Sequence, residues 1–291
     1  MGIDIHALNF VRYATRKKGL GDTVTIGRQG LHVIEPVIRQ TFAVKGDYRH
    51  PQYSEQILTD CLGADSVVSV DNSAYEGATY IHDMNQELPQ ELWKRFDTVI
   101  DGGCVEHVFN APQALRNCSL FLKPGGQIIH ILPANNFCGH GFWQCSPELF
   151  FSLYSSGNGY KDTEVFIADL TDPRRWYRVA KPVNGGRANV SSKTPLYALV
   201  RTVVGTEAFS HQRVQQSDYV HAWEGGGVPG RSEETPPPTG GSQKIKAFLR
   251  RSRAVHRLAS SLHQRLVARG TGLRSNPSLT TVDVERTIGS P

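Results

Sequence analysis

The sequence predicts an α/β fold in which helices cover both faces of a seven-stranded, mostly parallel sheet. Two observations carry this prediction. Residues 96–136 read as a buried strand, a helix and a second buried strand, and a crossover of this kind joins parallel strands. Short β-branched runs then alternate with helical patterns along the rest of the chain, as in α/β proteins. We expect the last hairpin to insert one antiparallel strand.

The first elements are a helix and a strand followed by a glycine turn. Apolar residues at helical spacing predict a helix over Ile3–Lys18, and Thr23–Ile26 is the first strand. The turn that follows contains Gly27, Arg28, Gln29 and Gly30. A second helix is expected within the apolar stretch 31–38, so the turn would present backbone N–H groups to a ligand.

The second and third strands each end near a carboxylate. A helix is expected over Tyr53–Leu62 and a strand over Ser66–Asp71. Asp71 is placed to accept hydrogen bonds from a ribose diol, as acidic residues do in nucleotide-binding α/β units; alternatively, it only caps the next turn. A third short strand, Ala78–His82, leads to Asp83.

The central unit runs from Phe96 to Asn136. The β-branched run 98–100 ends at Asp101, a helix begins near Pro112, and a second β-branched run covers Gln127–Leu132. Ligands of open α/β sheets bind beyond the carboxyl ends of the strands. This edge should therefore carry Asp101, Glu106, His107, Asn135 and Asn136.

The second half of the domain completes the sheet. The loop 135–147 gathers glycines, amides, aromatic residues and His140, and loops in this position often carry function. Ser146 starts a helix that extends through Tyr154. Strands are expected over Glu164–Leu170 and Leu196–Val204, separated by an insertion.

The chain has 291 residues, enough for one large domain and its appendages. We expect a domain over 1–223, a flexible linker rich in glycine and proline over 224–242, a basic amphipathic helix over 243–270 and a disordered tail over 271–291. Eight cations and no acids lie in 243–269, so the remainder of the chain is net acidic. The basic helix could contact an anionic membrane, a partner or nucleic acid, or fold back on the domain.

The five cysteines form no CxxC pair, which indicates a reducing compartment and neither a disulfide framework nor a zinc ribbon. There is no signal-peptide pattern and no apolar run of about 18 residues. We therefore expect a cytoplasmic protein, with peripheral membrane contact through 243–270 left open.

The acidic positions 71, 83 and 101, together with the LKPGG turn at 122–126, resemble the class I S-adenosylmethionine-dependent methyltransferases, which have a Rossmann-like fold. The resemblance covers roughly residues 21–204 and implies S-adenosyl-L-methionine as the cofactor. It implies that the first turn faces the methionine part, that the carboxylate at 71 holds the ribose, that positions 83 and 84 meet the adenine amine, and that the one at 101 lies under the amino-acid end. The implied cofactor-binding residues are Gly27, Arg28, Gln29, Gly30, Asp71, Asn72, Asp83, Met84, Asp101, Gly102 and Glu106.

The first turn departs from the family pattern, which has an acidic residue followed by GxG. Arg28 could pair with the cofactor carboxylate or fill the pocket. In-line methyl transfer to an oxygen also needs a base, and His107 and His140 are the candidates, although a loop histidine is often structural. Cys138 and Cys145 flank His140 at a spacing that does not indicate a metal.

The acceptor is expected to be a small molecule, a glycan or a lipid-linked group. Nucleic acid is unlikely as a substrate because the remainder of the chain is acidic and lacks an (N/D)PP(Y/F) motif. The alternative is a non-catalytic Rossmann-like binding module with a membrane- or partner-binding basic tail. A nicotinamide-dependent oxidoreductase is disfavoured because the GxGxxG fingerprint is missing.

Overall fold

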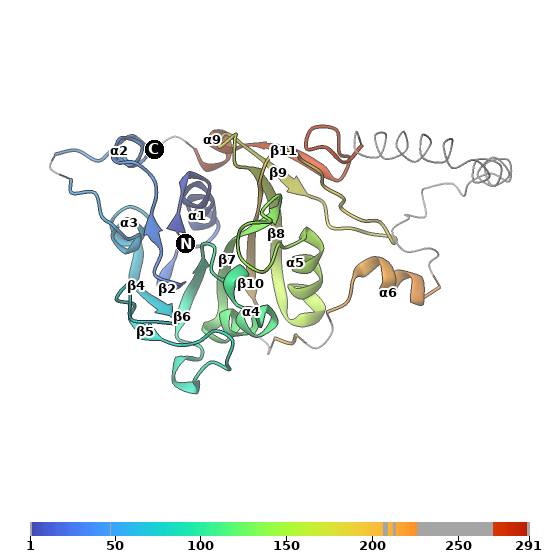
Figure 1. The fold of residues 1–291 in the computed structure, drawn as a ribbon, viewed down its shortest axis with the longest axis horizontal. Helices are drawn as coiled ribbons and strands as arrows, with labels where there is room; N and C mark the ends of the chain where they lie inside the picture. Colours follow the sequence, from blue (N-terminus) through green and yellow to red (C-terminus); the bar gives the residue numbers. More distant parts are fainter. Residues whose placement is uncertain (1, 47, 206–208, 212–213, 226–269, 290–291) are drawn as a thin grey trace.

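The computed structural model describes residues 2–46, 48–205, 209–211, 214–225 and 270–289 (Figure 1). Their centre is a nine-stranded sheet flanked by helices. In order across the sheet, the strands are β11 (Leu279–Asp283), β9 (Arg175–Val179), β8 (Tyr160–Asp169), β10 (Leu196–Val204), β7 (Leu122–Asn135), β6 (Phe96–Asp101), β2 (Gly21–Ile26), β4 (Ala64–Asp71) and β5 (Tyr80–Ile81).

The mostly parallel sheet expected from the sequence is confirmed. Strands β5, β4, β2, β6 and β7 are parallel neighbours, and β10 runs antiparallel between β7 and β8. The expected count of seven strands is too low, because β9 and β11 extend the sheet beyond β8 through antiparallel pairs. Strand β9 lies in the segment interpreted as an insertion.

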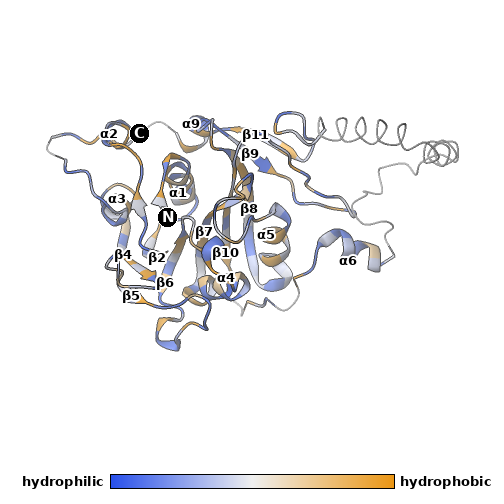
Figure 2. Ribbon diagram, in the orientation of Figure 1, coloured by the Kyte–Doolittle hydropathy of each residue, from blue (hydrophilic) through white to orange (hydrophobic). Residues whose placement is uncertain are grey.

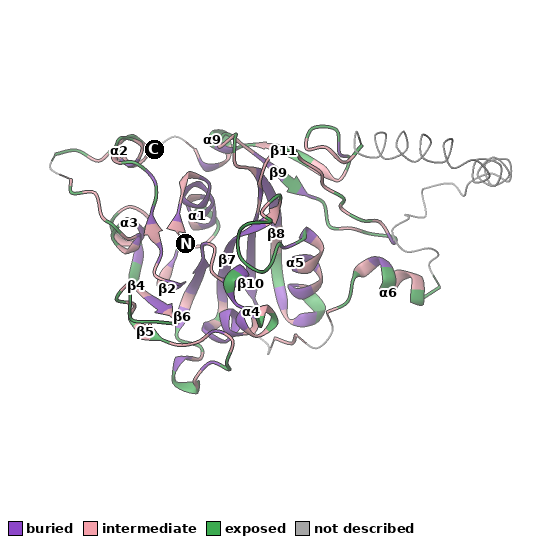
Figure 3. Cartoon of the chain, in the orientation of Figure 1, coloured by how far each residue is buried: buried purple, intermediate pink, exposed green. Residues whose placement is uncertain are grey.

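Helices cover both faces, as expected. The helices α1 (Ile5–Lys17), α2 (Glu35–Phe42), α3 (Glu55–Asp60) and α9 (Val284–Ile288) contribute to one hydrophobic core, and α4 (Ala111–Leu120) and α5 (Pro147–Leu153) contribute to the other. Neighbouring residues of a strand point to opposite faces: Ile100 belongs to the first core and Val99 to the second. Figures 2 and 3 show the apolar and buried residues concentrated in the central strands. A further helix, α6 (Ser217–Trp223), lies to one side (Figure 1).

The predicted disorder of 271–291 is wrong for residues 271–289. Strand β11 pairs with β9, and Val284 and Ile288 of α9 are buried in the core beneath α1. Asp283 caps α9, since its Oδ1 accepts a hydrogen bond from the backbone N–H of Arg286 at 2.9 Å. The segment is ordered because it covers the open edge of β9 and buries apolar side chains.

The glycine turn after β2 does not lead directly into a helix, contrary to expectation. Gly30–Leu31 form the short strand β3, which pairs in parallel with β1 (Gly2–Ile3). Helix α2 starts only at Glu35, with Pro36 in its first turn, where proline is well tolerated.

The expected linker and basic helix fall almost entirely outside the described residues, which include only 224–225 and Gly270 of them. Their proposed membrane contact and the cytoplasmic location stay predictions. Within the described part of the chain, no helix combines the length and apolar character needed to cross a bilayer.

Candidate active site

The carboxyl ends of the central strands meet at one edge of the sheet. Ile26 of β2 is level with Val70 of β4 on one side and with Asp101 of β6 on the other. The residues that follow these strands are therefore neighbours along this edge of the sheet.

Asp101 forms only internal contacts. Its side chain is fully buried; Oδ1 accepts hydrogen bonds from the N–H groups of Cys104 at 2.9 Å and Val105 at 3.3 Å, and Oδ2 lies 2.8 Å from Nδ1 of His130. Nε2 of His130 lies 2.7 Å from the hydroxyl of Tyr154 in the second core. Asp101 thus fixes the turn after β6. Sequence reasoning missed His130, whose only signal is a histidine within an apolar strand.

Glu106, His107 and His140 form a cluster above this turn. Glu106 and His107 lie in the 3₁₀ turn η2 (Val105–His107), and His140 comes from the loop after β7. Oε1 of Glu106 lies 3.4 Å from Nε2 of His140 and 3.8 Å from Nε2 of His107. The structure thus brings together the two histidines that the sequence singled out as candidate bases.

Glu106 is the buried member of the cluster. Its side chain is 1% exposed, and its Oε2 has no hydrogen-bond partner among the described residues. Burial, together with the charge of Asp101, raises the pKa of Glu106 to about 8. Burial and the nearby His140 lower the pKa of His107, so this imidazole favours the neutral form.

The loop that carries His140 is held against η2 by its backbone. The carbonyl oxygen of Glu106 accepts hydrogen bonds from the N–H groups of Phe142 at 2.7 Å and Trp143 at 3.3 Å. Gly141 makes this approach feasible: its φ is +67°, and a Cβ there would lie 2.9 Å from the carbonyl oxygen of Glu106. The position of His140 is therefore tied to that of Glu106.

A cavity of about 270 Å³ opens beside the cluster. Of the residues expected at the site, Gly102, Glu106 and His140 line this cavity, whereas Asp71 and Asp83 do not. Its lining is Gly2, Asp4, His32, Gly102, Gly103, Glu106, Ile131, His140 and Tyr197.

The Arg28 side chain makes its contacts within the chain, and its two expected roles towards the cofactor stay predictions. Its Nε forms an ion pair with Glu55 of α3 at 2.7 Å, one terminal nitrogen donates to the carbonyl of Glu76 at 2.6 Å, and the guanidinium lies 4.0 Å from the centre of the Tyr53 ring. Arg28 thus connects α3 to the loop between β4 and β5.

Gln29 and the N-terminal strand cover Gly102. The Gln29 side chain is buried and donates to the carbonyl of Ile26, while its Oε1 has no partner among the described residues. A Cβ at Gly102 would lie 2.7 Å from this Oε1, so a larger residue there would displace the Gln29 side chain. The N–H of Gly2 donates to the carbonyl of Gly102 at 3.2 Å.

The remaining expected cofactor residues follow β4 and β5. Asp71 is partly exposed and accepts hydrogen bonds from the N–H groups of Arg28 and Ser73, each at 3.3 Å; Asn72 beside it is exposed. Hydrogen bonds from the backbone and side chain of Asn85 lower the pKa of Asp83. Met84, in contrast, is buried.

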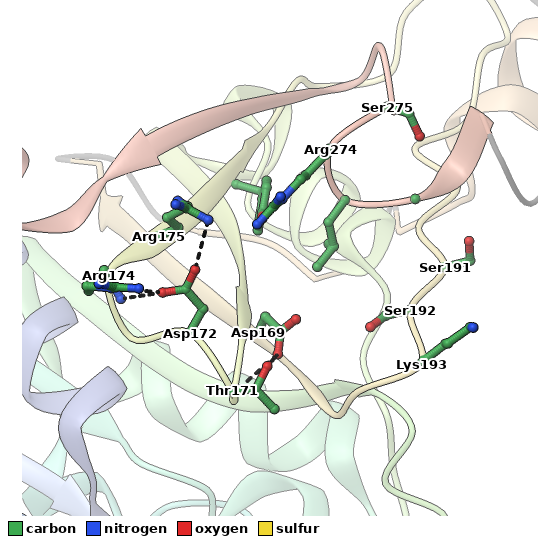
Figure 4. A pocket seen from close by; sticks show the side chains of 13 residues that line it. Asp169, Thr171, Asp172, Arg174, Arg175, Ser191, Ser192, Lys193, Arg274 and Ser275 are labelled. Atoms are coloured by element: carbon green, nitrogen blue, oxygen red, sulfur yellow. Dashed lines mark hydrogen bonds and ion pairs between the residues drawn. The ribbon is translucent and has the colours of Figure 1, made fainter.

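A larger cavity, of about 940 Å³, lies further along the same edge (Figure 4). Leu196 pairs with the last residues of both β7 and β8, Asn135 and Asp169, which places this cavity beyond the end of β8. Its lining includes four cations, Arg174, Arg175, Lys193 and Arg274. Asp172 pairs with two of them, at 3.6 Å and 3.1 Å. The sequence did not predict this cavity, which depends on β9 and the C-terminal segment.

No protein-family model matches the chain, and no curated protein matches it. Solved structures do match it. The YcgJ protein from Bacillus subtilis is 11% identical with a TM-score of 0.40, and the match covers 70% of this chain and 100% of that one. A SAM-dependent methyltransferase from Archaeoglobus fulgidus is 14% identical with a TM-score of 0.38, over 66% and 92% of the two chains.

The N-methyltransferase NodS from Bradyrhizobium japonicum, in complex with S-adenosyl-L-homocysteine, is 12% identical with a TM-score of 0.36, over 68% and 85% of the two chains. Likeness at these levels carries no inference about function.

Proposed function

We propose that the chain is an S-adenosyl-L-methionine-dependent methyltransferase whose cofactor lies along the carboxyl edge of the sheet. One observation carries the proposal: two buried side-chain oxygens at this edge have no hydrogen-bond partner within the described part of the chain. They are Oε2 of Glu106 and Oε1 of Gln29, next to Gly103 and Gly102 respectively. A buried unpaired acceptor destabilises a protein, and a ligand with a cationic amino group and a sulfonium would relieve that cost.

The remaining roles follow the order of the strands. Asp71, with Asn72 beside it, would accept the ribose hydroxyls, because its carboxylate is partly exposed at the end of β4. Asp83, with the backbone of Met84, would meet the adenine amine. Gly27, Gly30 and Gly102 would face the amino-acid end, with Asp101 beneath holding the turn in place. Arg28 would support this site indirectly, through the loop after β4.

His107 and His140 would serve the acceptor. Both imidazoles are more than a third exposed, at 40% and 49%, and His140 lines the 270 Å³ cavity. Alignment of the acceptor with the methyl group supplies much of the rate acceleration, and a neutral imidazole can take the proton of an acceptor hydroxyl. The lowered pKa of His107 suits this role near neutral pH.

The surroundings favour a small-molecule, glycan or lipid-linked acceptor. Phe109, Phe142 and Trp143 are exposed at 73%, 67% and 41% beside the His140 loop, and the rings of Phe109 and Phe142 meet edge to face. Aromatic surfaces of this kind suit a sugar ring or an apolar chain. The cations of the 940 Å³ cavity suit a negatively charged group on such a molecule.

A second candidate is a non-catalytic binding module, and one observation favours it. The pairing of β1 with β3 and the hydrogen bond from Gly2 to Gly102 cover the place where the amino-acid end of the cofactor would lie. In that case the edge of the sheet would be closed by the chain itself.

Isothermal titration of the full chain with S-adenosyl-L-homocysteine and with NAD separates these candidates. A methyltransferase binds one equivalent of S-adenosyl-L-homocysteine and no NAD. Binding of neither ligand would support the module, and binding of NAD alone would support an oxidoreductase.

A further inference from the structure

The cluster of Glu106, His107 and His140 has the composition of a metal site. It offers one carboxylate oxygen and two imidazole nitrogens, all within 4.8 Å of one another. Two imidazoles with one carboxylate are a ligand set used for zinc and for other divalent transition metals. The structure thus places three metal-binding groups together although they come from two separate segments of the chain.

The distances fit one cation between these groups. Ligand atoms bound tetrahedrally at about 2.0–2.1 Å are roughly 3.3 Å apart. The separation between Glu106 Oε1 and His140 Nε2 is 3.4 Å, and that between Glu106 Oε1 and His107 Nε2 is 3.8 Å. The three ligand atoms lie within 4.8 Å of one another, so the two exposed imidazoles would rotate towards the cation when it binds.

The buried carboxylate gives independent support. Glu106 is 1% exposed, and its Oε2 has no hydrogen-bond partner among the described residues. Protein structures rarely leave such a group unpaired, and a cation bound by both carboxylate oxygens would supply the missing partner in place of the cofactor. Neither imidazole contact supplies it, because both are made to Oε1.

The backbone around the cluster holds its members in place. Asp101 accepts hydrogen bonds from the N–H groups of Cys104 and Val105, and these bonds fix the start of η2. The N–H of His140 donates to the carbonyl of Phe137 at 2.9 Å, and the next residues of the loop are bound to the carbonyl of Glu106. Ligands on a fixed backbone lose little freedom when a metal binds.

We infer that Glu106, His107 and His140 bind one divalent transition metal ion of the zinc type, with a coordination position open to the 270 Å³ cavity. This inference extends the proposed function, and the role of the metal in catalysis rests on that function. The acceptor would coordinate the metal through an oxygen, and the metal would lower the pKa of that group so that its proton passes to solvent water before methyl transfer. The two histidines would then act as ligands rather than as free bases.

The test is equilibrium binding of Zn²⁺ to the full chain after treatment with EDTA. We expect one equivalent to bind, and Co²⁺ to bind in its place with visible absorption bands of a four- or five-coordinate ion. His140→Ala and Glu106→Gln should each weaken Zn²⁺ binding by about 100-fold or more, since even changing a hydrogen-bond partner of a ligand costs about 10–100-fold. His50→Ala, at a partly exposed histidine outside the cluster, should stay within about twofold of the wild type.

A thermal melt controls for folding: Zn²⁺ should raise the Tm of the wild type and of His50→Ala but not that of His140→Ala. The inference is overturned if the wild type binds no stoichiometric Zn²⁺, or if His140→Ala and Glu106→Gln bind it as the wild type does. A parallel titration with S-adenosyl-L-homocysteine keeps the two ideas apart. If the chain binds Zn²⁺ but not S-adenosyl-L-homocysteine, the proposed function is wrong and the metal site stands. If it binds S-adenosyl-L-homocysteine but not Zn²⁺, the metal site is wrong and the proposed function stands.

Discussion

The carboxylate of Asp101 lies 2.8 Å from the Nδ1 atom of His130, and both side chains are inaccessible to solvent. The other ring nitrogen of His130, Nε2, lies 2.7 Å from the hydroxyl of Tyr154, so the imidazole bridges the side chains of Asp101 and Tyr154. This chain joins β6 to β7 and to the C-cap of α5. Asp101 also accepts hydrogen bonds from the start of the turn that carries Glu106 and His107, so the two interactions are coupled.

Replacing His130 should therefore destabilise the fold strongly. His130→Ala leaves Oδ2 of Asp101 buried without its hydrogen-bond partner and opens a cavity in place of the ring, which together should cost about 3 kcal/mol or more of unfolding free energy. Urea denaturation measures this change. Tyr154→Phe removes only the outer hydrogen bond and should cost about 1–3 kcal/mol. A larger loss in Tyr154→Phe than in His130→Ala would contradict this view of the chain.

Glu106 should give the metal-free protein an unusual pH dependence. Its pKa is raised from 4.5 in a model compound to about 8 in the folded state, so the folded state holds the proton more tightly than the unfolded state does. This contribution to stability is complete below pH 4.5 and is lost as the pH rises towards 8. Urea denaturation in EDTA across that range should show the unfolding free energy of the wild type falling relative to that of Glu106→Gln.

The matched control is Glu91→Gln, at an exposed position. Its unfolding free energy should run parallel to that of the wild type across the same pH range. If the unfolding free energy of Glu106→Gln also runs parallel to that of the wild type, then the pKa of Glu106 is near its ordinary value. The cluster would then be more hydrated than the structure indicates.

Arg28 should control the mobility of the loop after β4. Lysine cannot reproduce a guanidinium that pairs with Glu55, donates to the carbonyl of Glu76 and stacks on Tyr53. In Arg28→Lys, the amides of residues 72–79 should exchange with deuterium about 10-fold faster, which corresponds to about 1.4 kcal/mol of local opening.

Arg39→Lys is the matched control for this loop. Arg39 makes the same kinds of contact, with Glu35 at 2.7 Å, the carbonyl of Gly46 at 3.0 Å and the ring of Tyr48 at 5.3 Å. Its replacement should affect exchange near Gly46 and leave 72–79 unchanged. Equal exchange at 72–79 in both variants would show that Arg28 does not hold that loop.

The C-terminal segment should contribute to the stability of the domain. Ile288 of α9 is 3% exposed in the core beneath α1, so Ile288→Ala should cost about 2–4 kcal/mol of unfolding free energy. Glu285→Ala changes an exposed position of the same helix and should cost less than about 0.5 kcal/mol. Similar urea midpoints for both variants would show that α9 does not pack on the domain in solution.

The sequence predicts the central fold well because its strands are determined by local pattern. The β-branched runs that end at Ile26, Asp71 and Asp101 are β2, β4 and β6, and the antiparallel place of β10 follows from a hairpin. Strands β9 and β11 could not be found in this way. Strand β9 forms a hairpin with β8 but lies in a segment rich in arginine and proline, and β11 pairs with β9 across about 100 residues of chain.

The site was predictable only in part, for the same reason. Chain order places Asp71 and Asp101 at one edge, but the contacts of Arg28 with Glu55 and Glu76 depend on how α3 and a loop pack. The approach of His140 to Glu106 spans 34 residues and depends on the conformation of Gly141. Such contacts leave no local pattern in the sequence.

The central claim is that the carboxyl edge of the sheet binds the methyl donor, and the affinity for S-adenosyl-L-homocysteine of Asp71→Ala compared with Asp65→Ala tests it most directly. Both residues lie on β4, Asp71 at the carboxyl end and Asp65 exposed near the amino end. We predict that Asp71→Ala weakens binding by about 10-fold or more, as loss of hydrogen bonds to a charged group does, and that Asp65→Ala stays within about twofold of the wild type. Binding that is equal in the two variants, or absent in the wild type, would contradict the claim.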